Sequence, residues 1–134
     1  MANLYGYQFA ISPVAGVVNL YGKITISGTA GAPTLVAASS KQMTSISRTS
    51  AGLYVLKLTQ TYNSFLGMDV NVMLASGVPA APVVSLVSET VASNNASTGQ
   101  KVTFQLQNNG GGSATDPDSG TVLYIHAKLK NSSV

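Results

Sequence analysis

The strongest constraint on the fold is an alternation of apolar and polar residues with a period of two. In segment 53–60, the residues that share one face are Tyr54, Leu56 and Leu58. That period is typical of a β-strand with one buried face. A second, more polar alternating segment begins at Ser45, and the turn Thr49-Ser50-Ala51-Gly52 follows it. Because Gly52 can adopt a positive φ, the two segments are predicted to form an antiparallel hairpin.

Alternation of the same kind recurs along the rest of the chain. The further predicted strands are 17–27, 34–37, 68–75, 83–91, 101–107 and 121–130. Turn residues separate them at intervals of roughly 8–15 residues, a spacing typical of antiparallel sandwiches and small barrels. We therefore predict an all-β protein, an antiparallel β-sandwich or small barrel of about seven or eight strands.

One short helical turn is expected near residues 61–66. Thr61 is suited to cap it, and Tyr62, Phe65 and Leu66 would share a face at i, i+3 and i+4. Such a turn would cover one open end of the sandwich with aromatic side chains.

The N-terminal segment 1–16 carries aromatic residues at alternate positions, Tyr5, Tyr7 and Phe9, before Pro13 and Gly16 interrupt the pattern. It has two interpretations. It is either an edge strand of the domain or an extended arm that pairs with a neighbouring subunit, because short apolar termini need a partner to become ordered. Residues 17–134 are expected to form a single β-domain.

The composition suggests a surface that contacts other proteins. Charged residues make up 8% of the chain, far below the roughly 25% of ordinary domains. A soluble monomer normally carries more charge. Low charge combined with many Ser, Thr, Gly and Val residues favours a β-protein whose surface is largely covered by its neighbours.

Few side chains are available for catalysis. The chain of 134 residues has no cysteine, four carboxylates and one histidine, His126. General acid–base chemistry requires two groups with separated pKa values in one cleft. We therefore expect no enzyme activity, cofactor or metal. His126 lies between Tyr124 and Lys128 on the polar face of the last predicted strand, and it is interpreted as a surface or subunit contact. The candidate partner-contact residues are Tyr5, Tyr7, Phe9, Tyr124, His126 and Lys128.

The seven cationic side chains are scattered along the chain and give a net charge of +3. No basic run of the kind that follows a phosphate backbone is present, so we expect no nucleic-acid partner. The apolar runs fall well short of the roughly 20 residues that span a membrane, and no secretion signal is visible. Synthesis in a cytoplasm and no membrane partner are the corresponding expectations.

Three stretches resemble a known class of proteins. They are GKITISGTAGAPTLV at 22–36, SISRTSAGLYVLKLTQTYNSFLGM at 45–68 and DPDSGTVLYIHAKLKNSSV at 116–134. Together they cover about half of the chain and resemble small structural proteins of tailed bacteriophages, in particular capsid decoration (cement) proteins. The shared motifs are structural and transfer no binding residue.

This resemblance implies a β-rich subunit, usually a homotrimer, on the outer surface of the virion capsid. There it would bind the major capsid protein and stabilise contacts between capsomers, after synthesis in the host cytoplasm. The alternative is another virion part: a head or tail fibre, or a receptor- or glycan-binding β-module. Its expected feature is an exposed aromatic cluster at the sandwich tip, and the loops 92–100 and 108–120 contain no aromatic residue.

Overall fold

The computed structural model describes residues 16–28, 30–75, 82–93, 99–108 and 112–131. These residues form eight strands and one short 3-10 turn, η1. The elements are β1 (Val17–Ser27), β2 (Ala32–Leu35), η1 (Ala37–Ser39), β3 (Met43–Ser50), β4 (Leu53–Leu58), β5 (Ser64–Met73), β6 (Val83–Glu89), β7 (Lys101–Gln107) and β8 (Val122–Lys130).

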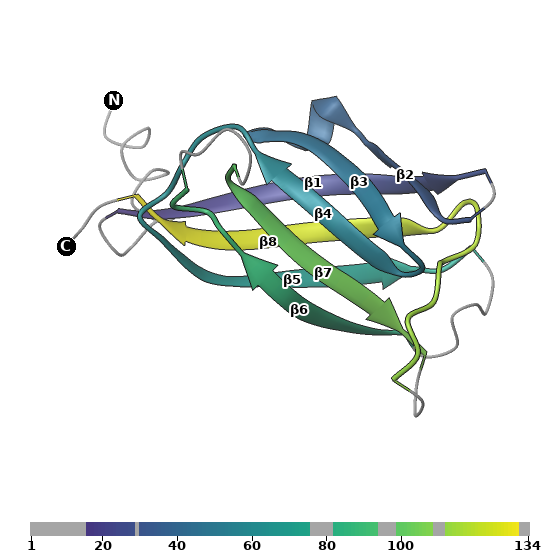
Figure 1. The fold of residues 1–134 in the computed structure, drawn as a ribbon. Helices are drawn as coiled ribbons and strands as arrows, with labels where there is room; N and C mark the ends of the chain where they lie inside the picture. The colour runs from purple at the N-terminus through teal and green to yellow at the C-terminus, as the bar shows by residue number, and fades with distance from the viewer. Residues whose placement is uncertain (1–15, 29, 76–81, 94–98, 109–111, 132–134) are drawn as a thin grey trace.

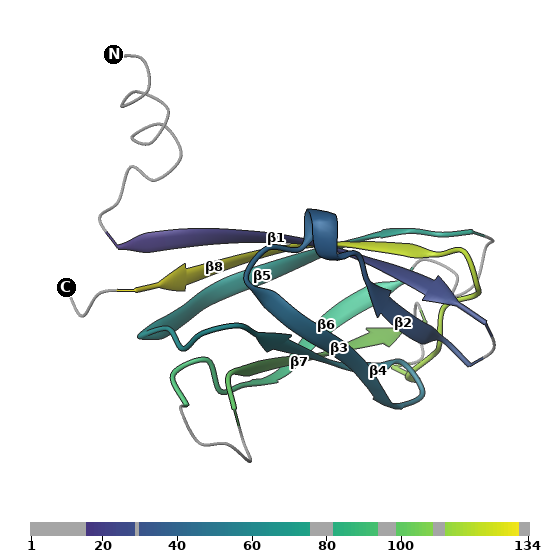
Figure 2. The same cartoon turned by 90° about the horizontal axis from the view of Figure 1, so that it is seen from above.

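The strands are arranged in two four-stranded sheets that lie face to face (Figures 1 and 2). Sheet A has the order β2-β1-β8-β5 and sheet B has the order β3-β4-β7-β6. Every neighbouring pair is antiparallel. The all-β antiparallel prediction is confirmed, and of the two architectures expected the structure is a sandwich rather than a closed barrel.

The core lies between the two sheets and is built from the faces that the alternation predicted. Leu56 and Leu58 of β4, Val102 and Phe104 of β7 and Leu123 of β8 are completely buried. The Tyr54 and Phe104 rings stack with centroids 5.7 Å apart. The buried Tyr54 hydroxyl donates to the Gly31 carbonyl at 3.0 Å, so this polar group keeps a hydrogen bond inside the core.

The β3–β4 hairpin forms where it was predicted, and its turn requires glycine for two reasons. Gly52 has φ +66°, in the left-handed region that other residues rarely adopt. A Cβ atom at this position would also lie 2.5 Å from the Leu106 carbonyl oxygen and 2.6 Å from the Thr115 nitrogen. The turn is therefore packed directly against the backbone at the end of β7 and in the segment that follows it.

The prediction of a helical turn at residues 61–66 is wrong. The one helical turn in the described chain is η1, and β5 already begins at Ser64. Ser64 and Phe65 pair with Lys130 and Leu129 of β8, so ladder pairing overrides the local helical spacing. Tyr62 is nevertheless buried, with its N–H donating to the Val91 carbonyl at 2.9 Å, whereas Leu66 is exposed.

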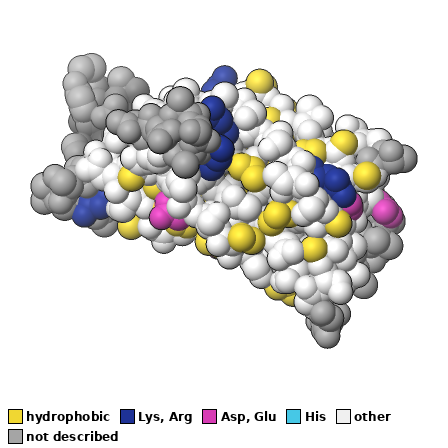
Figure 3. Space-filling view, in the orientation of Figure 1, with side chains coloured by type: hydrophobic (Ala, Val, Ile, Leu, Met, Phe, Trp, Pro, Cys, Tyr) yellow, Lys and Arg dark blue, Asp and Glu magenta, His cyan; other side chains and the backbone are white. Residues whose placement is uncertain are grey.

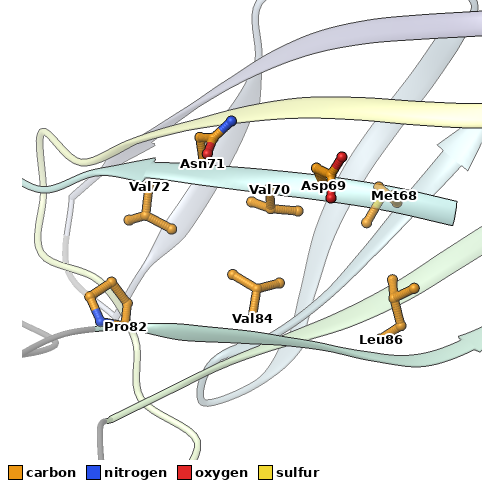
Figure 4. A pocket seen from close by; sticks show the side chains of 8 residues that line it. All are labelled: Met68, Asp69, Val70, Asn71, Val72, Pro82, Val84 and Leu86. Carbon is orange, nitrogen blue, oxygen red and sulfur yellow. The ribbon is translucent and has the colours of Figure 1, made fainter.

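The two long sides of the sandwich differ. On one side β2 and β3, the edge strands of the two sheets, pack against each other. On the other side the edge strands are β5 and β6. Their facing side chains border a cavity of about 600 Å³ (Figure 4). The sandwich is thus closed along one side and open along the other.

Candidate interaction surface

The outer face of sheet A gathers aromatic, charged and amide side chains from three adjacent strands. The ladders align Tyr21 of β1, His126 of β8 and Asp69 of β5 in one row across the sheet. The next row contains Lys23, Tyr124 and Asn71. Because directly opposed residues on a sheet share a face, these six side chains form one continuous surface, which we call the sheet A surface.

An aromatic stack stands at the centre of the sheet A surface. The Tyr21 and His126 rings are parallel to within 9° and their centroids lie 4.6 Å apart. His126 Nε2 lies 3.0 Å from Oδ1 of Asn19, which holds the imidazole in a fixed orientation. Tyr21 remains 61% exposed, so the stack presents a flat aromatic surface to solvent rather than filling the core.

A lysine ammonium group lies near a second aromatic ring of the sheet A surface. The Lys23 ammonium lies 5.9 Å from the centroid of the exposed Tyr124 ring, a distance compatible with a cation–π contact. Exposed tyrosines held by neighbouring side chains lose little conformational entropy when they are covered, which makes them effective contacts for another protein.

The structure brings together three of the six predicted contact residues. Tyr124, His126 and Lys128 all lie on the outer face of β8, with Tyr124 and Lys128 exposed and His126 half-buried. Tyr5, Tyr7 and Phe9 lie outside the described residues. The sequence analysis did not select Tyr21 and Lys23 as contacts. Their role depends on the pairing of β1 with β8, which alternation within one strand cannot reveal.

Two of the four carboxylates, Asp116 and Asp118, line one surface pocket, and the other two lie elsewhere. Asp69 lies on β5 of sheet A, whereas Glu89 lies at the end of β6 in sheet B. The described part of the chain contains no cluster of three or more His, Cys, Asp or Glu side chains able to hold a metal ion.

Asp116 is held in place by hydrogen bonds from the β3–β4 hairpin. Its carboxylate accepts hydrogen bonds from Arg48 Nε at 2.8 Å, from the second guanidinium nitrogen at 2.6 Å and from the Gly52 N–H at 2.8 Å. The Arg48 hydrogen bonds lower the pKa of Asp116 against the opposing effect of burial, and the same pairing raises the pKa of Arg48. Burial raises the pKa of the neighbouring Tyr54 phenol, which therefore stays protonated. This group fixes the segment before β8 to the hairpin.

The cavity between β5 and β6 is a second candidate surface, which we call the edge cavity. Val70 and Val72 of β5 face Val84 of β6 and Pro82 across it (Figure 4). Met68 and Leu86 also line it, and Asp69 and Asn71 border it. Most of its lining side chains are apolar, but more of its accessible surface is polar than apolar, so it offers both apolar side chains and polar groups to an occupant.

The outer face of sheet B is different in character. Figure 3 shows mostly uncharged surface with separate hydrophobic spots and few charged groups on the side of the molecule seen in Figure 1. Outward side chains there include Ser47, Thr103 and Gln105, and Ser85 Oγ is hydrogen-bonded to Gln107 Oε1 at 3.1 Å. This face lacks the exposed aromatic stack of the sheet A surface.

The described residues contain no helix with the length and hydrophobicity needed to cross a membrane. Comparison with known proteins finds no matching family model, no matching curated protein and no matching solved structure.

Proposed function

We propose that this protein is a structural subunit that works by binding protein neighbours, with no catalytic role and no cofactor. Two features support the proposal. The sheet A surface presents ordered aromatic side chains to solvent, and the edge cavity exposes apolar side chains along two strand edges. Exposed apolar groups in this arrangement are typical of protein-interaction sites.

We further propose that the subunit is a capsid decoration protein of a tailed bacteriophage, in line with the resemblance carried by residues 22–36, 45–68 and 116–134. It would act as a homotrimer on the outer capsid surface and bind the major capsid protein at threefold positions. Three linked footprints bind tightly even when each is weak, because the first contact raises the effective concentration of the others.

The observation that carries the proposal is the Tyr21–His126 stack beside the Lys23–Tyr124 pair. Side chains of this kind dominate the binding energy of interfaces. The charged members of this surface, Lys23 and Asp69, would need partners of opposite charge on the neighbour, because burying an unpaired charge is costly.

Binding to capsids that lack the protein tests the proposal. The wild-type chain should sediment with such capsids and raise their thermal stability. A Tyr21→Ala/Tyr124→Ala double variant should bind at least about tenfold more weakly, because it removes two exposed aromatic contacts. Thr103→Ala, on the outer face of sheet B, is the matched control and should bind normally. Failure of the wild-type chain to bind, or equal binding by the double variant, would refute the proposal.

A further inference from the structure

The inward faces of β5 and β6 are not covered as the other inward faces are. Met68, Val70 and Val72 alternate as a core face should, yet all three are only half-buried. Leu86 pairs with the fully buried Phe104 and still remains 47% exposed. The sandwich therefore leaves inward-facing apolar side chains in contact with solvent along this one side.

Exposed hydrophobic side chains are concentrated on the same two strands. Seven large hydrophobic residues are exposed in the described structure. Five of them lie on β5 or β6: Leu66, Met73, Val83, Leu86 and Val87. Within the described chain β5 pairs only with β8 and β6 only with β7, so each strand has one edge without a neighbouring strand. Free apolar edges of this kind are templates for an added strand.

The N-terminal segment has the composition that the edge cavity requires. Residues 1–15 contain no Lys, Arg, Asp or Glu side chain. Tyr5, Tyr7 and Phe9 repeat with the two-residue spacing of Met68, Val70 and Val72. A five-residue extended segment is about 16 Å long, so Tyr5–Phe9 spans the same length of strand as Met68–Val72.

The reach of this segment decides which copy of the chain supplies it. Val17 and Ser64 both pair with Lys130, so β1 and β5 begin at the same level of sheet A. A strand beyond β5 lies three strand spacings from β1, roughly 14 Å, and the level of Met68 is about 10 Å further along.

Around the strand ends this route is roughly 24 Å long, whereas the seven residues from Phe9 to Gly16 extend to at most about 24 Å. The chain's own segment would have no slack for the two corners it must turn. We therefore take the segment that fills the edge cavity to come from another molecule.

We propose that residues 4–11 of a second copy of this chain add as a strand between β5 and β6 and place Tyr5, Tyr7 and Phe9 in the edge cavity. Every copy would then donate one segment and accept another. A head-to-tail contact of this type closes into a ring when the rotation permits, which is compatible with a trimer. The inference rests on the proposed function in taking the N-terminal segment as a contact with a neighbouring subunit.

Site-directed cross-linking of the full chain tests the assignment, because the wild-type sequence contains no cysteine. A tagged Tyr7→Cys variant is mixed with an untagged Leu86→Cys variant and treated with a short bis-maleimide. We expect covalent heterodimers. Ser47→Cys, exposed on the outer face of β3, replaces Leu86→Cys as the control and should give at least tenfold less product.

A Tyr7→Cys/Leu86→Cys double variant distinguishes the donor. Cross-links that form only within one chain, and persist on dilution, would overturn the assignment to a second copy. A heterodimer yield no higher than that of the Ser47→Cys control would overturn the edge cavity as the acceptor.

A second measurement uses two arginine substitutions on β6. Leu86 lines the edge cavity and is 47% exposed, whereas Val83 is 48% exposed and does not line it. In sedimentation equilibrium, Leu86→Arg should weaken self-association at least tenfold and Val83→Arg should not. Equal effects of the two substitutions, or a wild-type chain that is monomeric at every concentration, would contradict the inference.

These results are separable from the capsid experiment. Cross-linking through the edge cavity without capsid binding would refute the decoration role and leave the strand exchange standing. If the Leu86→Arg variant still binds capsids and the cross-link fails, the strand exchange would be refuted and the decoration role would stand.

Discussion

The Arg48 guanidinium and the Asp116 carboxylate, 68 residues apart in the sequence, form two parallel hydrogen bonds of 2.8 and 2.6 Å. Arg48 lies on β3, and Asp116 lies in the segment that leads from β7 to β8. Asp116 also accepts the Gly52 N–H from the β3–β4 turn. This one carboxylate thus links the hairpin of sheet B to the chain that enters sheet A.

The first prediction concerns the pH dependence of stability. The pKa of Asp116 is lowered from its ordinary value of 3.8, so the ionised form stabilises the fold above about pH 4 and this contribution is lost as the pH falls through the lower folded value. Asp116→Asn should lower the Tm at pH 7, and the difference from wild type should shrink below pH 4. Thermal unfolding followed by circular dichroism measures both.

The exposed Asp69 provides the control for this prediction. Asp69→Asn should change the Tm at pH 7 by less than Asp116→Asn. A Tm difference between wild type and Asp116→Asn that is the same at pH 2 and pH 7 would show that the pair makes no ionic contribution.

The second prediction separates backbone strain from steric overlap at glycine. Gly52 and Gly28 have similar angles, φ +66° and +72°, but a Cβ atom at Gly28 would meet no atom within 4 Å. Gly28→Ala should therefore cost about 1 kcal/mol, the strain of the left-handed conformation alone. Gly52→Ala should cost at least about 1 kcal/mol more, because its Cβ overlaps backbone atoms that cannot move independently. Equal losses in urea unfolding would contradict this account.

The third prediction tests the openness of the sandwich between β5 and β6. Val102 is fully buried in the core, whereas Val72 faces the edge cavity. Val102→Ala should reduce the free energy of unfolding by roughly 2–3 kcal/mol, and Val72→Ala by less than about 1 kcal/mol. The comparison uses urea unfolding at a protein concentration that keeps the chain monomeric. Equal losses would mean that β5 is covered as fully as the core strands.

The fourth prediction concerns the N-terminal segment. The buried core of the described structure is formed by residues 20–129, so deleting residues 2–12 should leave the circular dichroism spectrum and the cooperativity of unfolding unchanged. The same deletion should weaken self-association and capsid binding. A truncated chain that unfolds, or one that assembles as well as the full chain, would show that the segment has another role.

Local sequence patterns determine much of this fold. The alternation in β4, β7 and β8 identifies Leu56, Phe104 and Leu123 as core residues, because a two-residue period leaves only the choice of face. Gly52 marks the hairpin turn for the same local reason. At 61–66 the spacing of apolar residues suits a helical turn, but pairing with β8 makes Ser64 and Phe65 part of a strand, and no local pattern contains that pairing.

The interaction surfaces depend on contacts that no local pattern contains. Asn19 and His126 are 107 residues apart, and only the pairing of β1 with β8 brings Tyr21 onto the imidazole. An irregularity between Leu86 and Ser88 shifts the register of β6, so a strict two-residue alternation does not hold over the whole predicted strand 83–91. The half-burial of Val70 and Val72 likewise follows from the separation of two sheet edges, a property of the assembled sandwich.

The most direct test of the central claim, that this chain holds protein subunits together, is an electron cryomicroscopy reconstruction. Capsids that lack the protein would be incubated with the purified chain and imaged beside untreated capsids. The account predicts additional β-rich density on the outer surface at threefold positions, with the outer face of sheet A or the β5–β6 edge in contact with a neighbour. Identical reconstructions with and without the protein would contradict it.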